Sequence, residues 1–139
     1  ITGGAGASYL TNDEAGPFTN KLYPPTSVTD IWDSVTNAFD FSELTLGSTI
    51  NFRIDLQLTT TVANQEVDLT IDVAIGGSSY TLFIDHSQYK TAGTYNYVNS
   101  FLIYMGDTNT LNNPAKFALA SPSNIDVVVN GWACDINVY

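Results

Sequence analysis

Cysteine is almost absent from this 139-residue chain. Its one cysteine, Cys134, has no second thiol in the chain to pair with, so a framework of internal disulfides is excluded. A chain of this length buries roughly two-thirds of the surface that its unfolded form exposes. We therefore expect a single domain that is held together by its own core or by assembly with other copies.

Positive charge is scarce as well, and the formal net charge at pH 7 is −10. The 14 acidic residues face only 4 basic ones, which are scattered along the chain: Lys21, Arg53, Lys90 and Lys116. Cations this few and this far apart cannot line a phosphate backbone, so nucleic-acid binding is disfavoured. Binding to an anionic membrane surface is disfavoured for the same reason.

Long hydrophobic runs are also lacking. No stretch of about 18 apolar residues occurs, so we expect no membrane span. The chain starts at Ile1 without a methionine, and its opening ITGGAGAS has neither the basic start nor the apolar centre of a signal peptide. We expect the chain to be a fragment of a longer protein.

The sequence does contain two long runs in which apolar and polar residues strictly alternate. They extend from Ile50 to Leu58 and from Val67 to Ile75. A period of two places all apolar side chains on one face of a strand and all polar ones on the other. Each run therefore predicts a long antiparallel strand with one buried face and one solvated face.

Shorter strand-like segments occupy the rest of the chain, and turn residues separate them. We expect strands at Ser8–Thr11, Phe18–Tyr23, Ser79–Asp85, Thr94–Met105, Ala115–Ala120 and Ile125–Tyr139. With about eight to ten strands and no long helix, the pattern predicts an all-β fold, an antiparallel β-sandwich or jelly roll. No alternation of strands and helices is present that would build a parallel sheet.

Three connections have distinct turn chemistry. Ala63-Asn64-Gln65 joins the two alternating runs, either as a turn or, because consecutive strands of a jelly roll often lie in opposite sheets, as a crossover. Gly76-Gly77 predicts a tight two-residue turn, since glycine tolerates positive φ. Asn130-Gly131 predicts a hairpin turn or a bulge within the last strand.

Residues 26–40 are ambiguous. Apolar residues recur there at helical spacing, and Ser27 is a suitable cap. The many β-branched, Asp, Asn and Ser residues, however, lose little by leaving a helix. We favour an irregular hairpin that turns near Thr36-Asn37 and brings Phe39 and Phe41 into the core, with one helical turn as the alternative.

Residues suited to catalysis are few. His86, the only histidine, lies in a polar stretch that we interpret as a solvated turn, and Cys134 alternates with apolar residues as a small buried side chain does. Asp68 and Asp72 share a strand face but stand about 13 Å apart, too far for the paired carboxylates of glycoside hydrolysis. We predict no catalytic residues, no metal ligands, no cofactor and no enzymatic activity.

Two late segments, residues 94–105 and 127–138, are apolar on both strand faces. One face of each strand can cover the core, and the other needs a partner. We expect a subunit interface there, with a platform of tyrosines that stack on sugars as the alternative. The polar face of the alternating runs is a second place to expect subunit contacts. The interface candidates are Arg53, Asp55, Asp72, Tyr95, Tyr97, Tyr104 and Trp132.

Four segments carry a family resemblance that covers nearly the whole chain: YLTNDEAGPFTN, DIWDSVTNAFDFSELTLGSTINFRIDLQLTTTVANQEVDLTIDVAIG, KTAGTY and VVVNGWACDINVY. Together they resemble a recurrent C-terminal domain of tailed-phage and prophage fibre proteins, in particular the knob of tail needles in short-tailed phages of the Shigella-phage type. The resemblance rests on an overall pattern and includes no catalytic signature.

The resemblance implies a homotrimeric jelly roll similar to tumour-necrosis-factor (TNF) heads, located at the extracellular tail tip of a virion. It implies a role in host attachment and genome ejection, in which the knob contacts or penetrates the cell envelope and meets an envelope component or a surface glycan. We then expect residues 1–16 to be a flexible lead from a longer fibre chain and residues 17–139 to be the knob. A monomeric carbohydrate-binding jelly-roll module is the alternative function.

Overall fold

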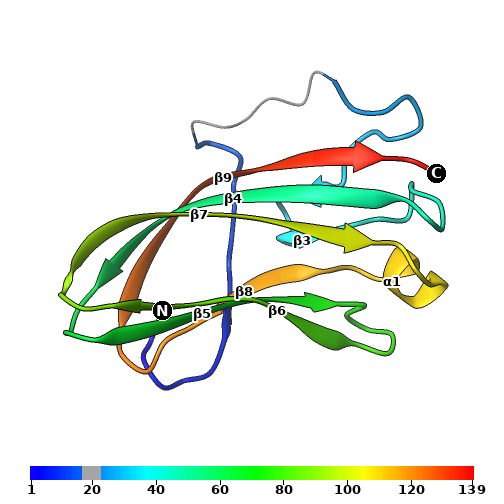
Figure 1. Ribbon diagram of the computed structural model, residues 1–139. Coiled ribbons are helices and arrows are strands. Elements are labelled where there is room, and N and C mark those ends of the chain that lie inside the picture. Colours follow the sequence, from blue (N-terminus) through cyan, green and yellow to red (C-terminus); the bar gives the residue numbers. More distant parts are fainter. Residues whose placement is uncertain (17–22) are drawn as a thin grey trace.

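The computed structural model describes residues 1–16 and 23–139, and within them the chain is almost entirely β-structure (Figure 1). The elements are β1 (Ser8–Tyr9), β2 (Trp32–Asp33), β3 (Ala38–Phe39), β4 (Thr49–Thr60), β5 (Gln65–Val73), β6 (Tyr80–Tyr89), β7 (Gly93–Tyr104), α1 (Thr108–Asn112), β8 (Lys116–Ala120) and β9 (Ile125–Asn137). This content confirms the predicted all-β fold. The strand expected at Phe18–Tyr23 falls largely outside the described residues.

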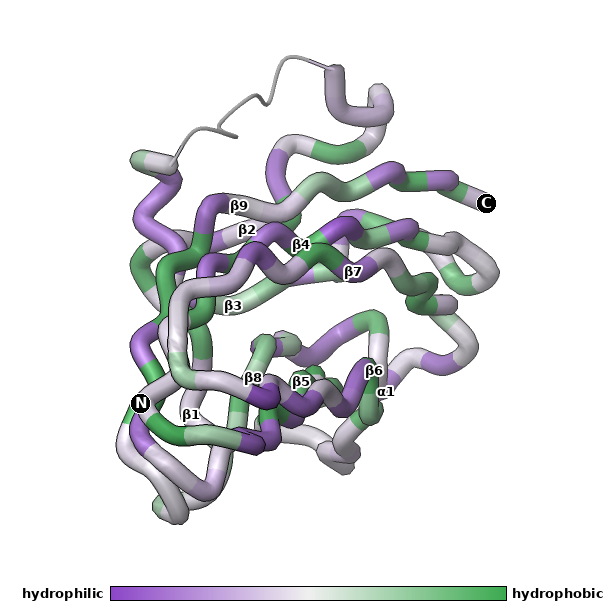
Figure 2. The backbone as a smooth tube through the Cα atoms, turned by 60° about the vertical axis from the view of Figure 1, so that its left-hand side comes forward, coloured by the Kyte–Doolittle hydropathy of each residue, from purple (hydrophilic) through white to green (hydrophobic). Residues whose placement is uncertain are grey.

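The strands form two main sheets that face each other, with a two-stranded ribbon beside them (Figure 2). The larger sheet has the strand order β1-β8-β5-β6, the smaller one β7-β4-β9, and the ribbon β2-β3. Neighbouring strands are antiparallel throughout. The molecule is therefore an antiparallel β-sandwich, as predicted, and the TNF-like jelly-roll order of its strands stays a prediction.

β4 is the central strand of the smaller sheet, and its sequence explains its position. It pairs with β7 on one side and with β9 on the other from Thr49 to Thr60. Its alternate apolar side chains point between the sheets and are at most 1% exposed: Ile50, Phe52, Ile54, Leu56 and Leu58. Because each such burial stabilises the fold by about 1.5–3 kcal/mol, the alternation selects the inner face of the strand.

The connection at residues 63–65 is a crossover, since β4 lies in the smaller sheet and β5 in the larger one. Asn64 adopts a positive φ of 55° at the bend. The buried side chain of Gln65 fixes the corner. Its Oε1 accepts from Thr61 N at 2.8 Å, and its Nε2 donates to Ser121 Oγ at 2.9 Å. The crossover alternative is thus confirmed, and the two alternating runs face each other across the core.

Residues 26–40 form the predicted hairpin and contain no helix. Trp32 pairs with Phe39, and Asn37 takes the positive φ of 52° at the turn between β2 and β3. Asp33 supports the turn by accepting from Val35 N at 2.8 Å. The hairpin delivers Phe39 and Phe41 to the core, where both are fully buried.

Phe39 lies at the centre of a cluster of aromatic rings that joins the ribbon to both sheets. Its ring centroid is 4.7 Å from Trp32, 5.1 Å from Phe52 of β4, 5.3 Å from Phe117 of β8 and 5.6 Å from Trp132 of β9. Tilted and edge-on contacts of this kind add to the energy of burial. The short ribbon is therefore an integral part of the core.

Two predictions are wrong: the tight turn at Gly76-Gly77 and the end of the following strand at Asp85. Gly76-Gly77 is not a two-residue turn, because residues 74–79 form a longer loop between β5 and β6. Asn109 of α1 holds this loop through Ser78, accepting from its N at 3.0 Å and donating to its O at 2.9 Å. β6 continues beyond Asp85 to Tyr89, so His86 lies in a strand and not in a turn.

Asn130 forms a bulge in β9. Asp55 of β4 pairs with Gly131 and Leu56 pairs with Val129, so Asn130 has no partner residue on β4. Gly131 is buried and adopts a φ of 149°, a backbone conformation that residues other than glycine rarely take. The bulge alternative of the sequence analysis is confirmed.

The first 16 residues lie along the sandwich. β1 pairs with β8, and Leu10 is buried in the core. Ile1 N donates to Ile125 O at 2.8 Å, and Gly4 N donates to Ser121 O at 2.9 Å. These contacts attach residues 1–10 to the sandwich, and the flexible lead expected at residues 1–16 stays a prediction. The proposed domain boundary at residue 17 adjoins residues outside the described part.

The central position of Phe39 gives a prediction for stability. Phe39→Ala removes a fully buried ring from the cluster, and we expect it to lower the free energy of unfolding by about 3–5 kcal/mol. Val35→Ala is the matched control in the same hairpin, because Val35 is 88% exposed; its effect should stay within about 0.5 kcal/mol. Urea denaturation monitored by tryptophan fluorescence measures both, and similar losses in the two variants would contradict the central role of Phe39.

Candidate functional site

The outer face of the smaller sheet carries large apolar side chains in contact with solvent. Val98, Leu102 and Tyr104 of β7 are 52%, 55% and 58% exposed, and Val128 of β9 is 53% exposed. These four residues, called the outer apolar patch below, point away from the core because their neighbours in sequence point into it. Exposed apolar residues gathered on one face mark contact surfaces more often than those scattered singly.

The outer apolar patch has two parts, one on β7 and one on β9, and polar residues of β4 separate them. β4 lies between β7 and β9, and its outward residues are polar. Among them, Arg53 and Asp55 form an ion pair, with 2.9 Å from Nε to Oδ2 and 3.3 Å from Nη2 to Oδ1. The hydrogen bond to Asp55 raises the pKa of Arg53 above its ordinary value. The only arginine thus neutralises one aspartate on this face.

A shallow depression lies on the same face beside Arg53. Ser100 and Leu102 of β7 line one side of it, and Ala133 and Asp135 of β9 line the other. The pairs Arg53↔Ser100 and Arg53↔Ala133 place Ser100 and Ala133 in one row with Arg53, and Leu102 and Asp135 lie in the next row, opposite Asn51. The surface is therefore broad and nearly flat, which suits contact with another protein surface better than enclosure of a small molecule.

The seven predicted interface residues do not gather on one surface. Arg53, Asp55 and Tyr104 lie on the outer face of the smaller sheet, with the outer apolar patch. Asp72 lies on the outer face of the larger sheet, on the opposite side of the sandwich. The three remaining candidates, Tyr95, Tyr97 and Trp132, point between the sheets.

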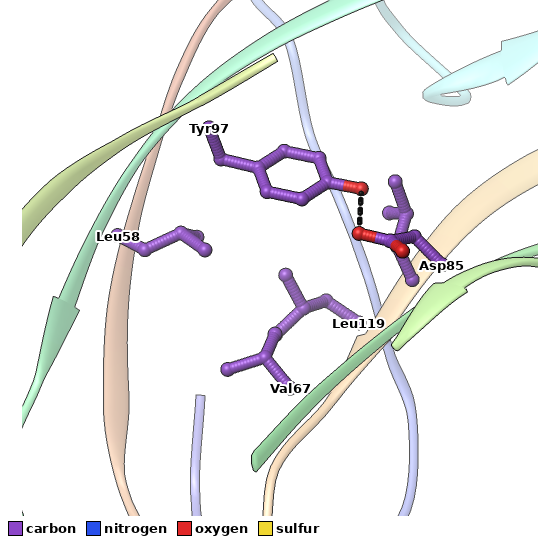
Figure 3. Close-up of a pocket in the computed structure, with 6 residues that line it drawn as sticks. Leu58, Val67, Asp85, Tyr97 and Leu119 are labelled. Atoms are coloured by element: carbon purple, nitrogen blue, oxygen red, sulfur yellow. Dashed lines mark hydrogen bonds between the residues drawn. The ribbon is translucent and has the colours of Figure 1, made fainter. Parts of the chain in front are cut away.

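Tyr97 is 9% exposed and lies at the edge of the core (Figure 3). Its hydroxyl donates to Asp85 Oδ2 of β6 at 2.9 Å and accepts from Asn99 Nδ2 at 3.0 Å. Burial is the main cause that raises the pKa of Tyr97 well above its ordinary value, and the bond to Asp85 adds to it. Leu58, Val67 and Leu119 line the small space beside the ring. Tyr97 thus joins the two sheets within one chain.

Tyr95 and Trp132 also make their contacts within the chain. The Tyr95 ring packs 4.5 Å from that of Tyr89, and its hydroxyl donates to Thr91 O at 2.6 Å. Trp132 packs edge-on against Trp32 at 4.7 Å. Its buried Nε1 has no hydrogen-bond partner among the described residues. Both side chains point between the sheets and are partly buried within the monomer, and their role in a subunit interface or in sugar stacking stays a prediction.

The outer face of the larger sheet carries hydrogen-bonded carboxylates. Asp72 accepts from the hydroxyls of Tyr9 at 2.8 Å and Thr81 at 2.6 Å. Asp68 lies 2.5 Å from Nδ1 of His86, its partner residue on β6. This hydrogen bond raises the pKa of His86 above its ordinary value of 6.5. Sequence reasoning missed this pair, because only the register of β5 and β6 brings the two residues together.

Cys134 and His86 cannot act as a nucleophile and its base. Cys134 is on β9 opposite Phe52, and its side chain packs against the core. His86 is on the outer side of the other sheet. Burial is the main cause that raises the pKa of the Cys134 thiol to about 12, so the thiol stays protonated at neutral pH.

Comparison of the chain with protein-family models, with curated proteins and with solved structures found no match. In the part of the chain that the structure covers, no helix is long and apolar enough to cross a membrane. No group of three His, Cys, Asp or Glu side chains within residues 1–16 and 23–139 is placed to hold a metal ion. The outer apolar patch is therefore the strongest candidate for a functional surface.

The His86–Asp68 pair gives a prediction for pH dependence. Asp68→Asn removes the carboxylate, so we expect the pKa of His86 to fall from its raised value toward 6.5. NMR titration of the imidazole measures this pKa directly, since the chain has one histidine. Asp72→Asn is the matched control on the same strand face, because Asp72 bonds Tyr9 and Thr81 instead.

The raised pKa also fixes the pH range in which the pair stabilises the fold. The stabilisation is fully present below pH 6.5 and is lost as the pH rises through the folded pKa. The difference in stability between wild type and Asp68→Asn should therefore shrink with rising pH. A wild-type pKa at or below 6.5, or an equal fall in both variants, would contradict the interaction.

Proposed function

We propose that this chain is a non-enzymatic, homotrimeric knob at the distal end of a phage tail needle or fibre. Three copies would assemble through the outer apolar patch and give a rigid tip that contacts or penetrates the host cell envelope during attachment and genome ejection. The knob would then act in the virion, outside the cell, against an envelope component or a surface glycan.

The observation that carries the assembly is the exposure of Val98, Leu102, Tyr104 and Val128 on one sheet face. Removing such side chains from water yields about 25 cal/mol per Å² of apolar surface. The polar centre carries no net charge, because Arg53 and Asp55 form an ion pair. An approaching copy therefore meets apolar side chains around a paired charge, with Asp126 and Asp135 of β9 on the same face.

A threefold ring is also compatible with predicted interface residues on two opposite faces of the sandwich. In a ring, each contact joins two different surfaces of neighbouring copies. The outer apolar patch of one copy can therefore meet a different surface of the next, and Asp72 on the larger sheet need not lie near Arg53 in the monomer. The place in a phage tail rests on the family resemblance of the sequence segments.

The alternative of a monomeric carbohydrate-binding module has less support. Its platform was expected from Tyr95, Tyr97 and Trp132, and these side chains point into the sandwich. Tyr104 remains as a single exposed ring, 58% exposed, on the outer apolar patch. A single ring is a smaller stacking surface than the one expected, so we retain the trimeric knob.

Assembly is tested by mass and by one matched pair of variants. We expect the wild-type chain at micromolar concentration to sediment at about 45 kDa, three times the 15.0 kDa of one chain, or at a whole multiple of that mass where trimers pair further. Leu102→Lys places an unpaired charge in the contact and should weaken assembly by at least about tenfold. Val35→Lys adds the same charge at a side chain that is 88% exposed and is not one of the four patch residues, and should leave the mass unchanged.

Analytical ultracentrifugation measures all three proteins. A wild-type chain that sediments as a monomer would exclude the trimeric knob. Equal weakening in both variants would show that added charge, and not the patch, controls assembly. Circular dichroism verifies that each variant keeps its β-structure.

A further inference from the structure

Each main sheet ends in two edge strands whose outward backbone groups have no partner strand. Counted over the described residues, these edges are β1 and β6 in the larger sheet and β7 and β9 in the smaller one. Natural proteins protect such edges with short strands, charges or bulges, because an unprotected edge pairs with another chain.

Three of the four edge strands carry this protection. β1 is only 2 residues long. β6 contains Asp85 and His86, and its register with β5 shifts at a bulge. β9 contains Asp126 and Asp135 and has the bulge at Asn130. Each of these strands is a poor template for a further strand.

β7 has none of these features. Its 12 residues, Gly93–Tyr104, include no charged residue and no proline. Its register with β4 is unbroken from Thr60↔Gly93 to Thr49↔Tyr104. It also carries Val98 and Leu102, which are half exposed. β7 is thus a long, regular and uncharged edge, the kind that pairs with another strand.

The core is incompletely covered on the same side of the sandwich. β6 and β7 are joined by residues 90–92, and these two edge strands lie on the same side of the facing sheets (Figure 2). Leu82 of β6 pairs with Ile71, which is fully buried, so both point between the sheets. Leu82 is nevertheless 38% exposed, and Tyr80 is 39% exposed. A contact along this side would cover both.

We propose that β7 pairs antiparallel with β7 of a second copy across a twofold axis at Ser100. In this register Ser100 meets its own counterpart, and Val98 of each copy lies opposite Leu102 of the other. The smaller sheets of the two copies then form one continuous sheet. The β6 strands of the two copies then lie on the same side as the junction, where the second copy reduces the exposure of Tyr80 and Leu82.

The distribution of charge favours a second copy as the occupant. Two chains with a net charge of −10 repel each other, and this repulsion is least where their surfaces carry no charge. β7 is the longest strand without a charged residue. Val98 and Leu102 are the outward residues on the two sides of Ser100, and Asn96 and Tyr104 are the next ones along the strand. An antiparallel pair of identical strands therefore opposes apolar to apolar side chains.

The twofold contact does not depend on the proposed trimer. A contact between identical edges closes with two copies, whereas a ring of three joins unlike surfaces. The two contacts can coexist as two rings joined through β7, or either one can occur alone. The mass of the wild-type chain therefore separates the two proposals.

Oxidative crosslinking tests the register. Ser100→Cys places two thiols opposite each other at a Cα separation of about 4.5–5.5 Å, which a disulfide can bridge. Asn96→Cys is the matched control on the same strand and face, since its counterpart would lie about 26 Å away in this register, at ~3.3 Å per residue. Wild type, which has Cys134 alone, is the second control. We expect Ser100→Cys to give at least tenfold more disulfide-linked dimer than either control on a non-reducing gel.

Equal crosslinking of the two variants, or none in Ser100→Cys, would overturn the twofold contact. Sedimentation of the wild-type chain gives the second readout. A mass of two or six chains supports pairing through β7, and six chains supports the trimer as well. A mass of three chains overturns the pairing and leaves the trimer standing, and a mass of one chain overturns both. Pairing of β7 with a strand of a different protein would appear as a monomer without crosslinks.

Discussion

The burial of one face of β4 is the constraint on which the rest of the structure depends. Because this strand is paired on both sides and its alternate residues are buried, its other face must be polar and must point outward. Arg53 and Asp55 occupy that outward face as an ion pair. Apolar outward residues are thereby confined to the flanking strands β7 and β9. The apolar surface available for assembly therefore lies on the edge strands of the smaller sheet. As a result, β7 can contact one copy through its outer face and another through its free backbone edge.

Much of the fold could be predicted because its main strands follow a period of two. The two alternating runs became β4 and β5, and the burial of their apolar residues confirms the predicted faces. The hairpin at residues 32–39 could also be predicted, since its Asp and Asn residues favour turns. The loop at residues 74–79 could not, because its length depends on Asn109, a residue more than 30 positions away. Contacts of this range leave no local pattern in the sequence.

The functional surface was predicted only in part, for a related reason. β7 and β9 are apolar on both faces, so periodicity does not show which face is buried. The structure buries Tyr97 and brings Trp132 into the aromatic cluster, while Val98 and Leu102, which were not among the candidates, are exposed. On its buried face, Tyr97 donates a hydrogen bond to Asp85 across the sheets, a long-range partner that the local sequence pattern does not show. The pair of His86 and Asp68 likewise required the strand register.

The central claim is that another copy covers β7 in solution. Amide hydrogen exchange measured by mass spectrometry tests this claim directly when the same chain is compared at low and high micromolar concentration. Covering β7 predicts that exchange in a peptide spanning residues 93–104 slows as the concentration rises, while a peptide from the hairpin at residues 32–39 is unchanged. Exchange in residues 93–104 that is independent of concentration across the range would contradict the claim.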